Sequence, residues 1–153
     1  MMAGFISHVV YHPHIPEQDA YPVEVTDPAA AGAAGAAAPV AEAEPIGDLM
    51  ATADITQGEK LFKVCAACHT IDVGGANRVG PNLAGIVGAK HAHAAGFAYS
   101  DALKAKAGET WTAESLNAFL WNPKKTITGT KMGYAGMKKP EDRAALIKYL
   151  QSK

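Results

Sequence analysis

Two cysteines and the histidine that follows them carry the most distinctive chemistry in this sequence. The run Cys65-Ala66-Ala67-Cys68-His69 places two thiols three positions apart and an imidazole directly after them. Thiols at this spacing can add across the two vinyl groups of haem, and the adjoining histidine can then supply an axial nitrogen to the iron. The motif therefore predicts one covalently attached haem c.

Two other uses of such a cysteine pair are less well supported by the rest of the sequence. A structural zinc site needs four protein ligands, and because no second cysteine pair exists, only His91 and His93 could complete one. A thioredoxin-like redox pair should lie beside a parallel sheet, and no alternation of strands and helices surrounds this motif. Haem attachment is the favoured interpretation.

Methionine is the residue type that could complete a six-coordinate iron. Three of the five methionines, Met1, Met2 and Met50, lie in the N-terminal part of the chain, which leaves Met132 and Met137. Met132 stands in a turn-rich run, residues 129–134, that can fold back over the haem. A thioether stabilises ferrous iron and raises the reduction potential. We predict Met132 as the second axial ligand and keep Met137 as an alternative, whose ordinary role would be core packing.

Short helices and long loops are the elements expected to position these groups. Asp54 has the spacing of a capping box and predicts the start of a helix that ends at Cys65. Glycine-rich residues 74–96 are expected to be mostly loop. Further helices are expected at residues 101–106, from Thr112 to a stop at Pro123, and from Pro140 through Leu150. No stretch alternates as a strand, so the sequence predicts an all-α fold.

Charge divides the chain into two unlike parts. Residues 1–54 hold eight acidic groups and no Lys or Arg, whereas residues 55–153 hold all 14 basic groups against seven acidic ones. Residues 1–12 are either the remnant of a membrane anchor or simply a flexible start of the chain. We expect residues 13–53 to be a flexible Ala/Pro/Glu linker and residues 54–153 to be the globular domain. The apolar run at residues 3–11 is shorter than the roughly 20 residues that span a bilayer.

Several blocks of residues 54–153 together resemble class I cytochrome c, both the mitochondrial form and membrane-anchored bacterial forms. The matching stretches are Cys65–His69, Gly80–Leu83, Gly96–Tyr99, Asn122–Lys125, Gly129–Met132 and Arg143–Leu150. The resemblance implies the class I cytochrome c fold, in which short helices and loops wrap around covalent haem. It also implies an electron-transfer protein rather than an enzyme.

Roles for individual residues follow from this resemblance. It implies that Cys65 and Cys68 hold the haem c and that His69 and Met132 are the axial ligands of the iron. The carbonyl of Pro81 would accept a hydrogen bond from the other ring nitrogen of that histidine. Two aromatic residues, Tyr99 and Trp111, would hydrogen-bond a haem propionate inside the protein.

Three positions depart from the family pattern. An arginine near the buried propionate is often present in the family, but this chain has Ala89, and Lys90 or His93 is a candidate replacement. Phe119 stands where mitochondrial forms place a tyrosine beside the methionine sulfur. Leu103 stands where the family has an asparagine near an internal water. These departures leave the reduction potential open.

The resemblance also suggests a place in a respiratory or photosynthetic chain. The protein would take electrons from a quinol-oxidising cytochrome bc1-type complex and pass them to a terminal oxidase or another acceptor. Six lysines belong to segments that ring the exposed haem edge in this family: Lys63, Lys124, Lys125, Lys131, Lys138 and Lys139. We expect a periplasmic domain tethered to the inner membrane, and no binding to nucleic acid.

Two other functions remain as alternatives. A haem enzyme or gas sensor would need an open sixth position on the iron, which Met132 argues against. An electron-input domain that serves one dedicated enzyme, rather than a mobile shuttle, is also compatible with a long linker.

Overall fold

Short helices joined by long loops form the part of the chain that this computed structural model describes, residues 42–153. The helices are α2 (Gly47–Thr52), α3 (Ile55–Cys65), α4 (Asp101–Lys104), α5 (Ala113–Trp121), α6 (Pro123–Thr126) and α7 (Pro140–Gln151). Within residues 42–153 no strand is present, and an isolated bridge pairs Lys90 with Thr110. The predicted all-α class is therefore confirmed for the described residues.

Residues 1–41 lie outside the described part of the chain. They include the whole anchor remnant expected at residues 1–12 and most of the linker expected at residues 13–53. In residues 42–153 no helix has the length and hydropathy needed to cross a membrane.

Polar side chains cap the helices close to the starts that the sequence predicted. The capping residues are Asp54 of α3, Ser100 of α4, Thr112 of α5 and Asn122 of α6. Each accepts a hydrogen bond from a backbone N–H in the first turn, which would otherwise have no partner inside the helix. Helix α7 has no such cap and begins instead with Pro140, in the first helical position, where proline is favoured.

Helix α5 ends just before Pro123, as predicted, but a second short helix follows at once. Asn122 is extended, with φ −155°, and ends α5, but its side chain also accepts a hydrogen bond of 3.1 Å from the backbone N–H of Lys125. Pro123 then opens the short helix α6. The same proline therefore ends one helix and starts another, because its fixed φ suits a first turn as well as it breaks an interior one.

Helix α2 corrects the predicted boundary between linker and domain. It lies inside the linker expected at residues 13–53, yet it packs against α7. Ile46, immediately before it, has no exposed surface, and the Lys148 ammonium of α7 donates a hydrogen bond of 2.9 Å to the carbonyl of Met50. Three apolar residues at helical spacing, Ile46, Leu49 and Met50, give this segment a face that packs against the core.

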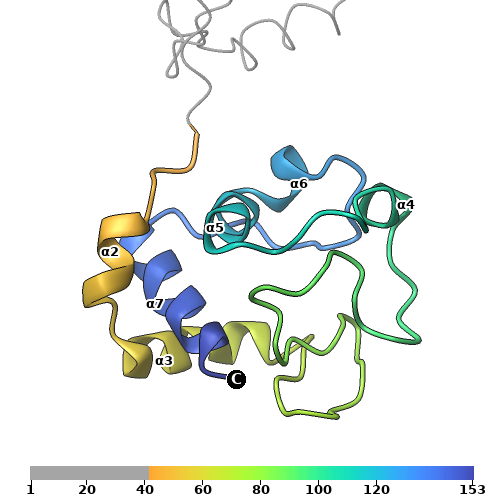
Figure 1. Cartoon of the computed structure of the whole chain (residues 1–153), viewed down its shortest axis with the longest axis horizontal. Helices are drawn as coiled ribbons and strands as arrows, with labels where there is room; N and C mark the ends of the chain where they lie inside the picture. Colours follow the sequence, from red (N-terminus) through yellow and green to blue (C-terminus); the bar gives the residue numbers. More distant parts are fainter. Residues whose placement is uncertain (1–41) are drawn as a thin grey trace, which may run out of the picture. The chain divides into compact units, whose positions relative to one another are not determined.

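The core is organised by the crossing of α3 and α7, which Figure 1 shows at the lower left. Gly58 lies where the two backbones meet, and a Cβ there would stand 2.7 Å from the Cβ of Tyr149. One turn further on, the rings of Phe62 and Tyr149 lie 5.6 Å apart. Helix α5 packs on the same α7. Because α3 ends at Cys65, this crossing determines where the cysteine motif begins.

Candidate functional site

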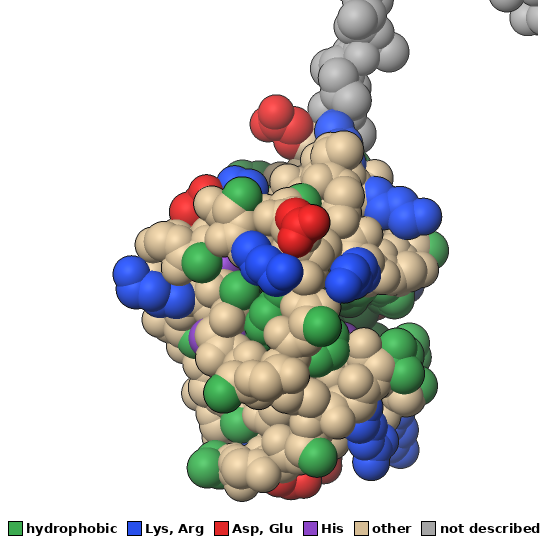
Figure 2. Space-filling view, turned by 90° about the vertical axis from the view of Figure 1, so that its right-hand side faces the viewer, with side chains coloured by type: hydrophobic (Ala, Val, Ile, Leu, Met, Phe, Trp, Pro, Cys, Tyr) green, Lys and Arg blue, Asp and Glu red, His purple; other side chains and the backbone are tan. Residues whose placement is uncertain are grey.

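A largely apolar cavity of about 530 Å³ lies between α3, α5, α7 and the loops before and after α5. Seven residues singled out in the sequence line it: Cys65, Cys68, His69, Pro81, Tyr99, Trp111 and Met132. Its volume is in the range of ligand and cofactor pockets in proteins. Figure 2 shows a hollow lined by hydrophobic side chains on one face of the domain, with Lys and Arg side chains on the surface around it.

The imidazole of His69 is oriented by the backbone beside it. Its Nδ1–H donates to the carbonyl of Pro81 across 2.8 Å, which leaves Nε2 as the nitrogen available to a metal. Gly80 lies against the ring, and a Cβ at that position would stand 2.6 Å from Nδ1. Burial lowers the pKa of His69, and the Pro81 carbonyl partly opposes this effect. The ring is therefore held neutral, as a metal ligand must be.

The two cysteines occupy the turn in which α3 ends. The backbone N–H groups of Cys68 and His69 both donate to the carbonyl of Cys65, at 3.0 and 2.9 Å. Both thiols are free, Cys65 half-buried and Cys68 exposed. Burial, and then the neighbouring Cys68, raise the pKa of Cys65. Since the turn brings two thiols and an imidazole to one cavity, these residues can hold a haem by two thioether bonds and one axial nitrogen.

Met132 and Met137 have different environments, although both are half-buried. Met132 lines the cavity, from a loop tied to the rest of the domain by a 3.0 Å hydrogen bond from the Lys131 ammonium to the carbonyl of Ala98. Met137 is not among the lining residues, and its backbone N–H donates to the carbonyl of Leu120 across 2.8 Å. The geometry favours Met132 over Met137 as a second axial ligand.

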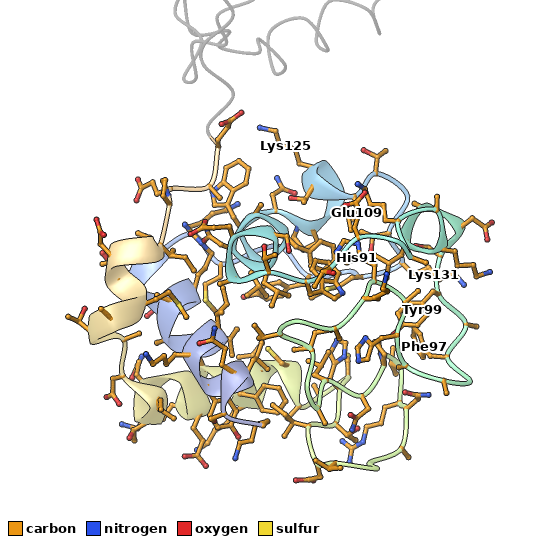
Figure 3. All side chains as sticks on the ribbon, viewed as in Figure 1. His91, Phe97, Tyr99, Glu109, Lys125 and Lys131 are labelled. Carbon is orange, nitrogen blue, oxygen red and sulfur yellow. The ribbon has the colours of Figure 1, made fainter. Side chains whose placement is uncertain are left out.

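Tyr99 is buried at the cavity wall. Figure 3 shows it beside Phe97. The two rings meet edge to face, with centroids 4.8 Å apart. The Tyr99 hydroxyl oxygen accepts a hydrogen bond of 3.1 Å from the backbone N–H of Ala94, which leaves its own proton free to be donated. Burial raises the pKa of Tyr99, so the hydroxyl stays protonated. It can therefore donate to an anionic group in the cavity.

Trp111 is buried at the same wall and packs against His91, which the sequence analysis considered only as a zinc ligand. His91 stacks on Trp111 with ring centroids 3.8 Å apart, and only 4% of it is exposed. Neither of its ring nitrogens has a hydrogen-bond partner in the described structure. A histidine in a loop of small residues carries no sequence signal for such a stack. The neighbouring candidates for the missing arginine, Lys90 and His93, do not line the cavity.

The zinc alternative finds no support in the described part of the chain. In residues 42–153 no three His, Cys, Asp or Glu side chains gather closely enough to hold a metal ion. His91 and His93 are therefore not placed to complete a site with the two cysteines. The parallel sheet that a thioredoxin-like site would need is also absent from these residues.

Comparison with known proteins decides the family. The family model described as cytochrome c matches residues 55–153. The chain belongs to the cytochrome c family. A cytochrome c homolog of Bradyrhizobium diazoefficiens is 44% identical over 153 residues, which covers 99% of this chain and 82% of that protein. Cytochrome c of Chlamydomonas reinhardtii is 52% identical over 99 residues, 64% of this chain and 88% of that protein.

A solved structure gives the same result for the fold. Cytochrome cH from Methylobacterium extorquens superposes with a TM-score of 0.61 at 46% sequence identity, covering 65% of this chain and 99% of that one. The class I cytochrome c fold is thereby confirmed. As a cytochrome c, the protein binds one covalent haem c and transfers electrons rather than catalysing a reaction. The apolar cavity, the two thiols and the oriented imidazole fit that group.

Proposed function

We propose that this cytochrome c shuttles single electrons from a cytochrome bc1-type complex to a terminal oxidase or another acceptor. The observation that carries the proposal is the meeting of Cys65, Cys68, His69 and Met132 at one apolar cavity. When bound, haem c supplies an iron that alternates between the ferric and ferrous states. Met132 would fill the sixth position of that iron, which a gas sensor or haem enzyme would keep open.

The side chains around the cavity have distinct tasks in this proposal. The two thiols attach the haem, and the Pro81 carbonyl holds the His69 ring in one orientation and increases its basicity. Tyr99 and Trp111 would hydrogen-bond a propionate and so offset the burial of its charge. The apolar walls exclude water from most of the site. A site held in one arrangement by these contacts reorganises little when one electron arrives or leaves.

The optical spectrum of the ferric protein tests the ligand assignment. We expect the weak near-infrared band of methionine bound to ferric haem, and we expect Met132→Ala to abolish it. Met137→Ala is the matched control and should keep the band, because Met137 lies away from the cavity. A band that survives in Met132→Ala would assign the sixth ligand to another methionine. Rapid carbon monoxide binding by the ferrous wild-type protein would exclude a methionine ligand and favour a sensor or an enzyme.

A ring of lysines is the proposed docking surface for the redox partners. Lys63, Lys124, Lys125, Lys131, Lys138 and Lys139 are all exposed. Lys131 lines the cavity mouth, while Lys125 extends from α6 (Figure 3). Two exposed apolar residues at the mouth, Val64 and Val79, are 66% and 82% exposed. Apolar contact inside a positive ring suits a partner that presents an acidic patch.

Electron-transfer kinetics with a bc1-type complex test this surface. We expect the second-order rate constant to fall as ionic strength rises, because the encounter is steered by charge. Lys131→Glu should lower the rate constant at low ionic strength far more than Lys60→Glu, which makes the same charge change at an exposed position on α3 outside the ring. Equal effects of the two substitutions would contradict docking through the ring and leave the electron-carrier function intact.

Location is the remaining part of the proposal. Haem is attached to this motif outside the bacterial cytoplasm, so we place the domain in the periplasm. The acidic, alanine- and proline-rich composition of residues 13–41 is suited to a tether that lets the domain move between membrane partners.

A further inference from the structure

Arg143, on α7, is a fully buried cation whose hydrogen bonds all go to uncharged oxygens in the described structure. It has no exposed surface. Its Nε–H donates to the Asn117 side-chain oxygen across 2.6 Å, and Nη1 donates to the carbonyls of Met137 and Lys138 at 2.9 and 2.7 Å. A longer bond of 3.4 Å joins Nη2 to the carbonyl of Glu44. Such a buried charge is expensive unless every donor is used.

These bonds bring together three segments that are distant in sequence. Asn117 belongs to α5, Met137 and Lys138 lie in the loop that carries Met132, and Glu44 belongs to residues 42–46, here called the leading segment. Asn117 uses both ends of its amide, because its Nδ2 also donates to the Glu44 carbonyl across 2.8 Å. Ile46, two residues further on, is completely buried and keeps the leading segment against the domain.

Residues 127–139 join α6 to α7 and carry Met132, and they are here called the methionine loop. This loop is anchored on both sides of Met132. On one side of Met132, the Lys131 ammonium donates to the Ala98 carbonyl. On the other side, Met137 is held through its N–H by the Leu120 carbonyl and through its own carbonyl by Arg143. The same guanidinium also binds the leading segment. Movement of that segment would therefore weaken the contacts that Arg143 makes with the loop.

We propose that Arg143 is a positioning residue for Met132 that couples the leading segment to the methionine loop. When the leading segment is seated, Arg143 holds the end of the loop and Met132 stays on the iron. When the segment is displaced, Arg143 loses partners and the loop opens more easily. This inference rests on the proposed role of Met132 as the axial ligand.

Competition by imidazole for ferric haem tests the coupling in the full-length holoprotein. Imidazole binds only when Met132 leaves the iron, so its apparent affinity reports how easily the loop opens. We expect Arg143→Lys to raise that affinity about tenfold, the effect of losing one charge-assisted hydrogen bond. Ile46→Ala, which loosens the leading segment, should raise it several-fold. In the double variant Ile46→Ala should add little, because its effect passes through Arg143.

A matched control separates coupling from a general loss of stability. Ile147→Ala removes the same side chain from an equally buried position on α7. We expect it to lower the urea midpoint measured by circular dichroism about as much as Ile46→Ala, yet to change imidazole affinity less than twofold. Equal effects of the two isoleucine variants on imidazole affinity, or multiplicative effects in the double variant, would overturn the proposal.

Other outcomes of the same experiment are also informative. If Arg143→Lys does not fold, Asn117→Ala replaces it, because that change removes a partner of Arg143 and a donor to Glu44 together; unchanged imidazole affinity in Asn117→Ala would overturn the coupling. If the wild-type protein lacks the near-infrared methionine band, the ligand assignment itself fails, which is distinguishable from a failure of the coupling alone.

Discussion

At the scale of single residues, the stack of His91 on Trp111 places an ionisable ring against the cavity wall. Burial lowers the pKa of His91; nearby Glu109 opposes this effect and Lys106 adds to it. Lys106 and Glu109 themselves form an ion pair of 2.8 Å. The buried ring is therefore neutral at pH 7, and neither of its nitrogens has a hydrogen-bond partner in the described structure.

The sign of the His91 shift gives a prediction for acid stability. Because the folded-state pKa lies below the ordinary value near 6.5, the unfolded chain binds more protons over the interval between them. The contribution of neutral, buried His91 to the free energy of unfolding is therefore complete above about pH 6.5, and it is lost as the pH is lowered through that interval. His91→Phe keeps an aromatic ring on Trp111 without the titration. Urea denaturation at pH 7 and pH 5 should show that this variant loses less unfolding free energy on acidification than the wild-type protein does. An identical loss in the two proteins would contradict the assignment.

At the scale of elements, the crossing of α3 and α7 depends on the absence of a side chain. The space that a Cβ at Gly58 would need is already filled by the Ala145 carbonyl and the Tyr149 side chain. Gly47, in α2, is the opposite case, since nothing lies within 4 Å of the position its Cβ would take. Of these two helical glycines, only Gly58 therefore stands where a side chain would clash.

Substitution by alanine distinguishes these two glycines. Gly58→Ala forces the helices apart and should destabilise the holoprotein by about 1–3 kcal/mol, the usual cost of overpacking. Gly47→Ala should instead stabilise it by about 0.4–1 kcal/mol, because alanine restricts the unfolded chain and favours helix. Chemical denaturation of both variants measures the difference. A Gly58→Ala protein as stable as the wild type would show that the crossing is not tight.

At the scale of the whole molecule, the haem cavity occupies the place where a core would otherwise close. The apolar side chains that line this cavity of about 530 Å³ lose packing partners on one side when no haem fills it. The domain and its haem must therefore form one cooperative unit.

Removal of the haem tests this dependence. In a Cys65→Ser, Cys68→Ser chain purified without haem, we expect much weaker helical circular dichroism and no cooperative urea transition. The apolar walls lose their filling while the entropy of the ordered loops must still be offset. A haem-free chain with the same helix content and a sharp transition would contradict the cooperative unit.

Sequence reasoning succeeded where local chemistry determines the structure. The cysteine motif, the caps at Asp54 and Thr112, and the start at Pro140 all depend on neighbours within a few residues. It failed where long-range packing decides. Helix α2 was assigned to the linker because the alanine- and proline-rich composition around it hides the apolar spacing.

Two further residues illustrate why distant packing was missed. Arg143 was noted only as part of a matching block, since a charged residue is ordinarily exposed, and its burial depends on carbonyls contributed by Glu44, Met137 and Lys138. The stack of His91 likewise depends on Trp111, which lies 20 residues further along the chain. The bridge between Lys90 and Thr110 brings the two residues together.

Because α3 and α7 pack on each other, residues 66–139 form one closed loop between them. Lengthening such a loop costs little, since each doubling of its length adds only about 0.6 kcal/mol of closure entropy. Insertions in residues 74–96 should therefore be tolerated where they spare Gly80, Pro81 and the stack of His91 on Trp111. One residue inserted within α3 would instead rotate Phe62 by roughly 100° relative to Gly58 and away from Tyr149. The same change in length should therefore be tolerated in the loop and not in α3.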